Sequence, residues 1–564
     1  MKGLGFSRAV SAAKSAAASG AKEHSVIKQP RDLSEPRSVL CDAIITRLAR
    51  FLKMPSTPSQ PTVAVAGGGL AGLAAACALS DAGFRITLFE KRPFVGGRAS
   101  SWEHPGTGEV VDNCQHVLFR LCTNLIEFYD RIGVADQIRW YDEMTFIEPG
   151  GRTSVMKSSP LPAPLHTAPS FLRFSFLNTA DKLCIARALL PLTLTDQPDT
   201  GQSFQHWLDR HGQTKQAVER FWRPILVSAL SEDLDLISIS AAAQVVRESM
   251  KSPAARQMGV PTVPLTDLYN AAGDYIRARG GVLHFRHPLE TFAADSSQVR
   301  LHLRGQDENQ QGDPEEAFDY LILALPFENL ARILPQAPES APIREQLSHF
   351  ETAPITGIHL WFDRQISDLD HAVLLDRTIQ WMFHKSRLQP MRTQGSAAEQ
   401  RKNAAHGVSR GSGDKHDAAP EGRKNADLTD SSPDGSYIEL VVSSSKTLID
   451  KSRAEIIDLA LSEVREFFPA ARQANLVKST VIKELHATYS PRPGIDAHRP
   501  AAATNWPRVF LAGDWTATGW PATMEGAVRS GYRAAETLAR AAGLKDSSFL
   551  SSDLPPTGLM RLFK

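Results

Sequence analysis

The chain has 564 residues, of which 42% are hydrophobic and 22% are charged, and its formal net charge is +1. This length exceeds what one hydrophobic core usually serves, so we expect two or more domains. Because the net charge is near zero, overall charge gives no reason to expect nucleic-acid binding. No run approaches the roughly 18 apolar residues of a membrane-spanning helix.

The cysteines and the N-terminal segment indicate the cellular environment in which the protein works. Five cysteines, an odd number without C-x-x-C spacing, predict a reducing compartment and neither a zinc nor an iron–sulfur site. Residues 1–60 are rich in Ala, Ser, Lys and Arg and lack the continuous apolar core of a secretory signal. We interpret them as a disordered basic tail, with an amphipathic anchor attracted to anionic lipid as the alternative.

A glycine turn follows an apolar strand at 63–66, and a helix is expected at 70–82. In G-x-G-x-x-G spacing, the first glycine permits a tight turn, the second lets the backbone approach a pyrophosphate, and the third lets the helix pack close to the strand. The helix N-terminus would bind the diphosphate through its free N–H groups. We therefore predict a dinucleotide site that includes Gly67, Gly68, Gly69, Leu70, Ala71 and Gly72.

The next segment continues this site. A second strand at 85–89 ends at Glu90, about 20 residues after the glycine turn, where an acid binds ribose hydroxyls. Lys91, Gly97 and Arg98 follow. A glycine permits close approach to a phosphate and a guanidinium neutralises it, so we assign these residues to the dinucleotide site as well.

Polar residues gather at the end of a short strand at 109–112. They are Asp112, Asn113, Gln115 and His116, and an apolar helix is expected at 123–132. Strand ends are where α/β proteins often place chemistry. The alternative left open is that Asp112 and Asn113 cap a turn while His116 is a half-buried histidine with satisfied hydrogen bonds.

The middle of the chain changes character. Residues 151–265 lose the strand–helix alternation and predict a helical segment that covers a substrate, although their aromatic stripes fit a plain core equally well. Aromatic strands at 356–362 and 379–383 fit the floor of an apolar pocket. Residues 392–436 are Gly, Ser, Ala, Lys and Asp without aromatics, which predicts a disordered insertion.

The last motif is a strand at 508–512 that ends in Ala-Gly513-Asp514, followed by a loop and a helix that opens at Met524. With the glycine turn and the Gly97–Arg98 motif, it resembles the three fingerprints of FAD-dependent amine oxidases and carotenoid-type desaturases. The resemblance implies FAD, bound by Gly513, Asp514, Met524 and Ala527 at its flavin end. It also implies contacts from Leu289 to the adenine and from the turn at Ala324.

The implied fold class is α/β, a Rossmann-type FAD-binding domain with an inserted substrate domain of mixed sheet plus helical cap. The domains expected on this basis are a basic tail (1–60), FAD-binding segments (61–150, 266–335 and 501–545), a helical cap (151–265), substrate-domain segments (336–391 and 437–500), a disordered insertion (392–436) and a C-terminal tail (546–564).

Four stretches narrow the resemblance, at 112–116, 355–363, 379–383 and 513–526. Together they look like the hydroxysqualene dehydroxylase family of hopanoid-making bacteria, over about residues 62–540. Cys114 departs from the glycine of many relatives. The resemblance implies reductive removal of the hydroxyl of hydroxysqualene to give squalene, for hopanoid or triterpenoid biosynthesis. The implied partner is an apolar isoprenoid and not nucleic acid. No motif indicates the electron donor.

This chemistry assigns roles as hypotheses. His116 would protonate the leaving hydroxyl, with Asp112 as its orienting partner. Substrate-pocket candidates are Trp361, Phe383, Trp515 and Trp520, with ordinary core packing as the alternative for the tryptophans. A carotenoid- or phytoene-type desaturase that runs as an oxidation is the first alternative, a flavin amine oxidase the second and a non-enzymatic FAD scaffold the third. The expected location is cytoplasmic, with peripheral contact to the inner face of the plasma membrane because the substrate is insoluble.

Overall fold

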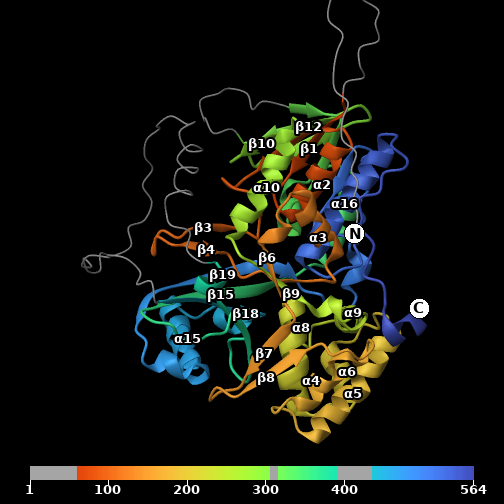
Figure 1. Ribbon diagram of the computed structural model, residues 1–564. Helices are drawn as coiled ribbons and strands as arrows, with labels where there is room; N and C mark the ends of the chain where they lie inside the picture. The colour runs from red at the N-terminus through yellow and green to blue at the C-terminus, as the bar shows by residue number, and fades with distance from the viewer. Residues whose placement is uncertain (1–59, 305–315, 390–434, 564) are drawn as a thin grey trace, which may run out of the picture. The chain divides into compact units, whose positions relative to one another are not determined.

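The computed structural model describes residues 60–304, 316–389 and 435–563 (Figure 1). The tail predicted at 1–60, apart from Gln60, and the insertion predicted at 392–436, apart from Gly435 and Ser436, lie outside these ranges. None of the described helices combines the length and the apolar character needed to cross a membrane.

A five-stranded parallel sheet carries the glycine turn. Its strand order is β10-β2-β1-β14-β20. The strands are β1 (Thr62–Ala66), β2 (Arg85–Glu90), β10 (Val282–Phe285), β14 (Tyr320–Leu323) and β20 (Val509–Leu511). The central strand β1 is an apolar run buried on both faces, as expected for a parallel sheet covered on both sides. The five strands come from positions spread over most of the described chain. Local sequence therefore could not predict which strands pair with each other.

Three helices pack around this sheet: α2 (Leu70–Asp81), α10 (Leu265–Ala278) and α16 (Met524–Ala541). Alanine-rich α2 lets α16 approach closely, since a Cβ on Gly531 would lie 2.2 Å from the Ala71 carbonyl oxygen. The start of α3 (Thr123–Arg131) is tied to the start of α16, because the buried Glu525 carboxylate accepts from the Leu125 backbone N–H at 2.7 Å. The segments that carry the first and third predicted FAD motifs therefore pack directly on each other.

A seven-stranded mixed sheet forms the second layer, in the order β19-β15-β18-β17-β16-β7-β8. Its strands are β7 (Glu143–Ile147), β8 (Thr153–Lys157), β15 (Thr352–Phe362), β16 (His371–Leu374), β17 (Trp381–His384), β18 (Ser436–Ser443) and β19 (Leu476–Tyr489). α15 (Arg453–Phe467) packs on one face through an apolar core. Its N-terminus is stabilised by a capping box between Ser452 and Glu455.

Residues 168–250, inside the segment predicted as a helical cap, are mostly helical and are called the cap. Its main helices are α4 (Ala168–Arg173), α5 (Thr179–Leu194), α6 (Phe204–Arg210), α8 (Arg223–Leu230) and α9 (Ile239–Met250). The aromatic side chains of this segment divide between two environments. Phe174 and Phe176 are 1% exposed and stack at 4.7 Å in the cap core, whereas Phe171 lines a cavity.

Smaller elements connect these layers. Two three-stranded sheets are formed by β11 (Leu289–Ala294), β12 (Val299–Leu303) and β13 (Glu316–Phe318), and by β5 (Leu118–Phe119), β6 (Ile138–Tyr141) and β9 (Met258–Pro261). β3 (Ser101–Glu103) pairs with β4 (Val110–Asp112), and short helices are α7 (Lys215–Ala217), α11 (Phe327–Ile333), α12 (Ser340–Ser348) and α13 (Lys385–Leu388). The α/β class with a mixed sheet and a helical cap is confirmed.

Candidate functional site

A cavity of about 1440 Å³ reaches from the glycine turn to the helical cap. Its wall includes the carboxyl ends of the parallel strands, the face of the seven-stranded sheet that carries Phe383, and helices α4 and α5. A single small-molecule ligand usually occupies roughly 300–1,000 Å³. The cavity therefore has room for an extended cofactor together with a second ligand.

The glycine turn forms one end of this cavity. A Cβ on Gly67, whose φ is +111°, would lie 2.3 Å from the Ala324 carbonyl oxygen, and a Cβ on Gly72 would lie 1.9 Å from the Gly67 carbonyl oxygen. Only glycine fits either position. Gly69 begins α2 without a capping side chain, so the first N–H groups of the helix are available to an anion.

Glu90 stands beside this turn at the end of β2. The side chain is 6% exposed, and its two carboxylate oxygens accept from the backbone N–H groups of Gly68 at 2.7 Å and Arg92 at 2.8 Å. Each oxygen keeps a second lone pair. Glu90 and the neighbouring Lys91 line the cavity, so the fixed carboxylate can accept hydrogen bonds from ribose hydroxyls.

Arg98 joins the second motif to the third. Its guanidinium donates from Nη2 to Asp514 Oδ1 at 2.7 Å and from Nη1 to the Ala487 carbonyl at 2.7 Å. Burial opposes its charge, but the Asp514 carboxylate outweighs this and raises the Arg98 pKa above its ordinary value. Gly97 lies against Gly69, since an added Cβ would approach the Gly69 Cα to 3.0 Å. The three motifs thus surround one volume.

Helix α16 begins at the same wall. Thr523 caps it by accepting from the Gly526 N–H at 3.1 Å, and Met524 and Ala527 line the cavity. The positive end of this long helix therefore faces the cavity and favours a ligand that carries negative charge there.

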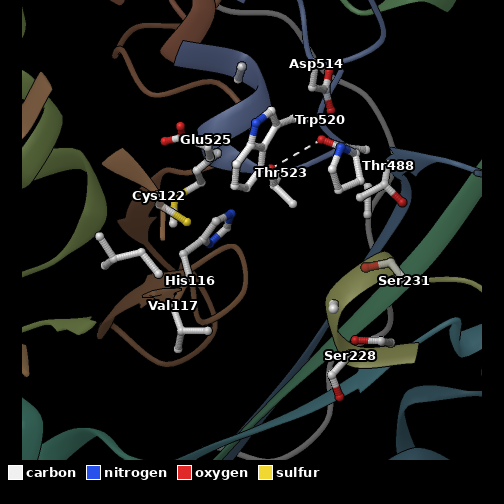
Figure 2. Close-up of a pocket in the computed structure, with 18 of the residues that line it drawn as sticks. His116, Val117, Cys122, Ser228, Ser231, Thr488, Asp514, Trp520, Thr523 and Glu525 are labelled. Atoms are coloured by element: carbon white, nitrogen blue, oxygen red, sulfur yellow. Dashed lines mark hydrogen bonds between the residues drawn. The ribbon is translucent and has the colours of Figure 1, made fainter. Parts of the chain in front are cut away.

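The loop before α16 is held by a buried arginine. Arg499 donates from Nη2 to the backbone carbonyls of Trp520, at 2.7 Å, and Asp514, at 3.1 Å. The Trp520 indole lines the cavity, with the Arg529 guanidinium carbon 4.4 Å from its ring centroid. Figure 2 shows the His116 ring directed toward Trp520 and Thr523.

His116 lines the cavity and is half-buried. Its Nδ1 lies 2.7 Å from the Cys114 carbonyl oxygen, an arrangement that requires a proton on Nδ1 and leaves Nε2 as the acceptor of a neutral ring. Burial lowers the His116 pKa below its ordinary value, against the opposing hydrogen bond to Cys114. At neutral pH the ring is therefore uncharged and suited to accept a proton.

The prediction that Asp112 orients His116 is wrong. Asp112 does not line the cavity, and its Oδ2 accepts from Lys385 Nζ at 2.6 Å and its Oδ1 from Ser101 Oγ at 2.5 Å. Both Asp112 and Lys385 are 2% exposed. Burial alone would raise the Asp112 pKa, but the Lys385 ammonium holds it below its usual range. Asp112 is an anchor of its segment and not a partner of the histidine.

Lys385 is the centre of a buried polar cluster that the sequence did not indicate as part of the site. Besides Asp112, its Nζ donates to Gln115 Oε1 at 2.8 Å, and Gln115 Nε2 donates to the His116 carbonyl at 3.0 Å. Glu439 Oε2 lies 3.5 Å from the same Nζ, and burial raises the Glu439 pKa to about 8. The available signals were a lysine directly after the apolar strand β17 and a glutamate, Glu439, inside the apolar strand β18.

Comparison with known proteins places the chain. A profile described as flavin containing amine oxidoreductase matches residues 70–539. The chain belongs to this family. It is 26% identical over 490 residues to the 15-cis-phytoene desaturase of Synechococcus elongatus, covering 84% of this chain and 95% of the relative. It is 25% identical over 500 residues to the zeta-carotene desaturase of a Synechocystis species, covering 84% and 96%.

Two solved structures share the fold of this chain. An oxidoreductase from Methanosarcina mazei superposes with a TM-score of 0.59 at 15% identity, covering 83% of this chain and 98% of that one. A redesigned putrescine oxidase superposes with a TM-score of 0.57 at 16% identity, covering 86% and 98%. The family match over residues 70–539, and not these distant structures, makes the chain an FAD-dependent oxidoreductase.

The residues present fit FAD. Backbone N–H groups at α2 and the glycine contacts at Gly67 and Gly72 provide the close approach that a diphosphate needs. Glu90 is placed for the ribose, and Leu289 and Ala324 line the same wall. Other predicted positions that line the cavity are Gly67, Gly69, Leu70, Ala71, Lys91, Gly97, Arg98, Gly513, Asp514, Met524 and Ala527. Gly68 and Gly72 do not line the cavity. Gly68 donates its N–H to the Glu90 carboxylate, and Gly72 lets the start of α2 lie close to Gly67.

The four residues predicted for the substrate pocket divide between the cavity wall and other surroundings. Phe383 and Trp520 line the cavity. Trp361 does not, because it stacks on Tyr437 at 4.3 Å near the end of β15. Trp515 does not either, since it is 1% exposed in a core cluster and its Nε1–H donates to the Leu325 carbonyl at 3.0 Å. Trp381 belongs to the aromatic strand predicted at 379–383, although it is not one of the four named candidates, and it lines the cavity beside Phe383 at a ring distance of 5.6 Å.

Proposed function

We propose that this flavoprotein desaturates a long apolar isoprenoid of the carotenoid type. One observation carries the proposal: a single cavity joins the FAD motifs to the apolar cap, and a neutral His116 lines it. The named activities of the two desaturase relatives support the same substrate class.

The chemistry balances as removal of one hydride and one proton from adjacent carbons, which leaves a C=C bond. Bound FAD supplies the two-electron acceptor for the hydride. His116 Nε2 accepts the proton, because hydrogen bonding to Cys114 holds the other nitrogen protonated. The side chains of Trp381, Phe383 and Trp520 contact the hydrocarbon of the substrate and exclude water from the reacting carbons.

Lys385 supports this arrangement from behind as a positioning residue. Through Asp112 and Gln115 it fixes both ends of the short segment that carries His116. The segment leaves strand β4 and would otherwise be a loop with freedom to move. Fixing it keeps the acceptor nitrogen within the short distance that proton transfer requires.

Reductive dehydroxylation of hydroxysqualene is the second candidate. It is favoured by the motif resemblance at 112–116 and 513–526. In this reaction the substrate loses its hydroxyl as water, taking one proton and one hydride. His116 would then have to donate a proton, and its lowered pKa disfavours the protonated form at neutral pH.

One anaerobic experiment separates the two candidates. Oxidised holoenzyme is mixed with phytoene in detergent, and reduced holoenzyme with hydroxysqualene, each for a single turnover. We expect loss of the oxidised flavin absorbance and a more unsaturated polyene in the first mixture. Squalene formation with flavin reoxidation in the second, together with no reaction in the first, would replace desaturation by dehydroxylation.

A further inference from the structure

One charged side chain in the cavity wall has no partner of opposite charge among the described residues. Arg256 ends the short helix η4 (Ala254–Arg256), which follows cap helix α9, and its side chain lines the cavity. The guanidinium donates from Nη2 to Met156 Sδ, and a thioether sulfur is a weak acceptor. Burial lowers the Arg256 pKa to about 10, and no acid of the described chain opposes this. At neutral pH Arg256 is therefore charged and unbalanced.

The neighbours of Arg256 supply no negative charge. His166 is fully buried, and neither of its ring nitrogens has a hydrogen-bond partner in the part of the chain that the structure describes. Burial and the Arg256 charge lower the His166 pKa to about 4, so this ring is neutral. Glu248 is the one acid of the cap that lines the cavity, and its Oε1 already lies 2.5 Å from Lys251 Nζ.

The surroundings of Arg256 define the ligand group that fits it. The cap side of the cavity is lined by apolar side chains such as Phe171, Phe221 and Ile225. A charge in such surroundings is costly unless a group of opposite charge pairs with it. A carboxylate pairs with a guanidinium through two parallel N–H···O bonds and brings one negative charge. A diphosphate would bring excess charge, since the one cavity-lining cation of the cap, Arg187, is exposed.

Strand pairing fixes the position of Arg256 relative to His116. Arg256 comes two residues before β9, His116 comes two residues before β5, and these strands pair in antiparallel register. The two residues therefore lie at opposite ends of the strand pair. Leu118 and Phe119 of β5, which lie between them, also line the cavity. An extended ligand can thus contact Arg256 at one end and pass along an apolar wall toward His116.

We propose that Arg256 binds a carboxylate at one end of the isoprenoid substrate, with the hydrocarbon along Leu118 and Phe119. The isoprenoid chain in this inference rests on the proposed function, whereas the carboxylate site rests on Arg256 and its missing partner. A hydrocarbon without the carboxylate still fits the apolar wall, but it binds more weakly because Arg256 stays unbalanced.

Equilibrium binding to oxidised holoenzyme tests the site. Geranylgeranoic acid and geranylgeraniol, which share one chain but end in a carboxyl or a hydroxyl group, are titrated in detergent at about pH 8, where the acid is ionised. We expect the acid to bind roughly tenfold to hundredfold more tightly than the alcohol. Because the enzyme already carries its FAD, the anion that is measured is not the cofactor.

Two arginine variants locate the effect. Arg256→Met keeps an apolar side chain of similar length without the charge, and it should bind the acid no more tightly than the alcohol. Arg120→Met is the matched control and should keep the wild-type preference. Arg120 lies in the same small sheet, but its guanidinium stacks 3.8 Å from the Trp140 ring centroid and it does not line the cavity.

Thermal unfolding separates a ligand site from a structural role. Ligand-free Arg256→Met should have a Tm equal to or above that of the wild type, because it removes an unbalanced cation and leaves no partner behind. The acid should raise the Tm of the wild type and not that of the variant. Equal affinity of the wild type for acid and alcohol would overturn the proposal. So would unchanged acid affinity in Arg256→Met, and a lower Tm in that variant would then make Arg256 a structural residue.

Failure of this proposal and failure of the proposed function give different results. Binding to oxidised enzyme requires no turnover, so acid binding through Arg256 without desaturation would confirm the carboxylate site and refute the proposed function alone. Desaturation of phytoene together with equal affinities for acid and alcohol would do the reverse.

Discussion

The two ends of the cavity are built in different ways. At the nucleotide end, recognition comes from backbone geometry in one continuous segment, β1 to β2, where Gly67 and Gly72 allow contacts that no side chain permits. At the reaction end, it comes from side chains that are distant in sequence, such as His116 and Lys385. The first kind of site is intolerant of any added atom, while the second depends on charge and hydrogen-bond partners. The predictions below test this difference.

The largest effect is expected at the glycine turn. Gly67→Ala should abolish FAD retention, because its Cβ would lie 2.3 Å from the Ala324 carbonyl oxygen. Gly83→Ala is the matched control: its φ of +85° is also positive, but nothing lies within 4 Å of an added Cβ. Flavin content per purified chain is the measurement. Equal losses in both variants would attribute the effect to backbone strain and not to the close approach.

His116→Gln should slow the single-turnover reaction by about 10²–10⁴-fold, the range for loss of a general base or acid. The FAD content and the substrate affinity of this variant should equal those of the wild type. In the wild type the rate should rise with pH through a pKa below 6.5 and then level, because burial favours the neutral ring. Unchanged turnover in the variant would mean that another group moves the proton.

Lys385→Met should lower the free energy of unfolding by about 3–5 kcal/mol, since it leaves the buried Asp112 carboxylate without its partner. Denaturant unfolding measures this. Asp112→Asn in the same chain should recover part of the loss. Lys478→Met, which breaks a half-exposed pair with Glu109 at 2.7 Å, should cost less than about 1 kcal/mol. Similar costs at the two lysines would show that the cluster is not effectively buried.

Phe383→Leu should raise KM for the apolar substrate roughly fivefold to tenfold, because it removes apolar contact area inside the cavity. Trp361→Phe should leave KM unchanged, since Trp361 stacks on Tyr437 outside the cavity wall. Steady-state kinetics on both variants compares the two predicted pocket positions directly. A KM effect at Trp361 would contradict the assignment.

A pH-dependent effect on stability is expected at Glu439. Its folded pKa of about 8 exceeds the ordinary value of 4.5, so the folded chain binds the extra proton between these pH values. Stability therefore falls as pH rises through this window. Glu439→Gln removes that loss and should gain about 1 kcal/mol per pH unit over the wild type between about pH 6 and pH 8. If the free energy of unfolding changed with pH in the same way in the wild type and in Glu439→Gln, the raised pKa would be refuted.

Local patterns were sufficient for the nucleotide end. The strand, glycine turn, helix and acid from Val63 to Glu90 lie within one βαβ unit, so their spacing alone determines their relative positions. The same holds for the cap of α16 at Thr523. These features follow from residue type and short-range geometry.

The reaction end depended on the tertiary structure. Asp112 and His116 are near in sequence, yet the carboxylate turns toward Lys385, which is 273 residues away. Trp361 and Phe383 looked equivalent as aromatic residues in apolar strands, and only the pairing of β15, β17 and β18 decided which of them faces the cavity. The sequence by itself determined the cofactor, because backbone geometry is local. The tertiary structure decided the site, because side chains meet only after distant strands have paired.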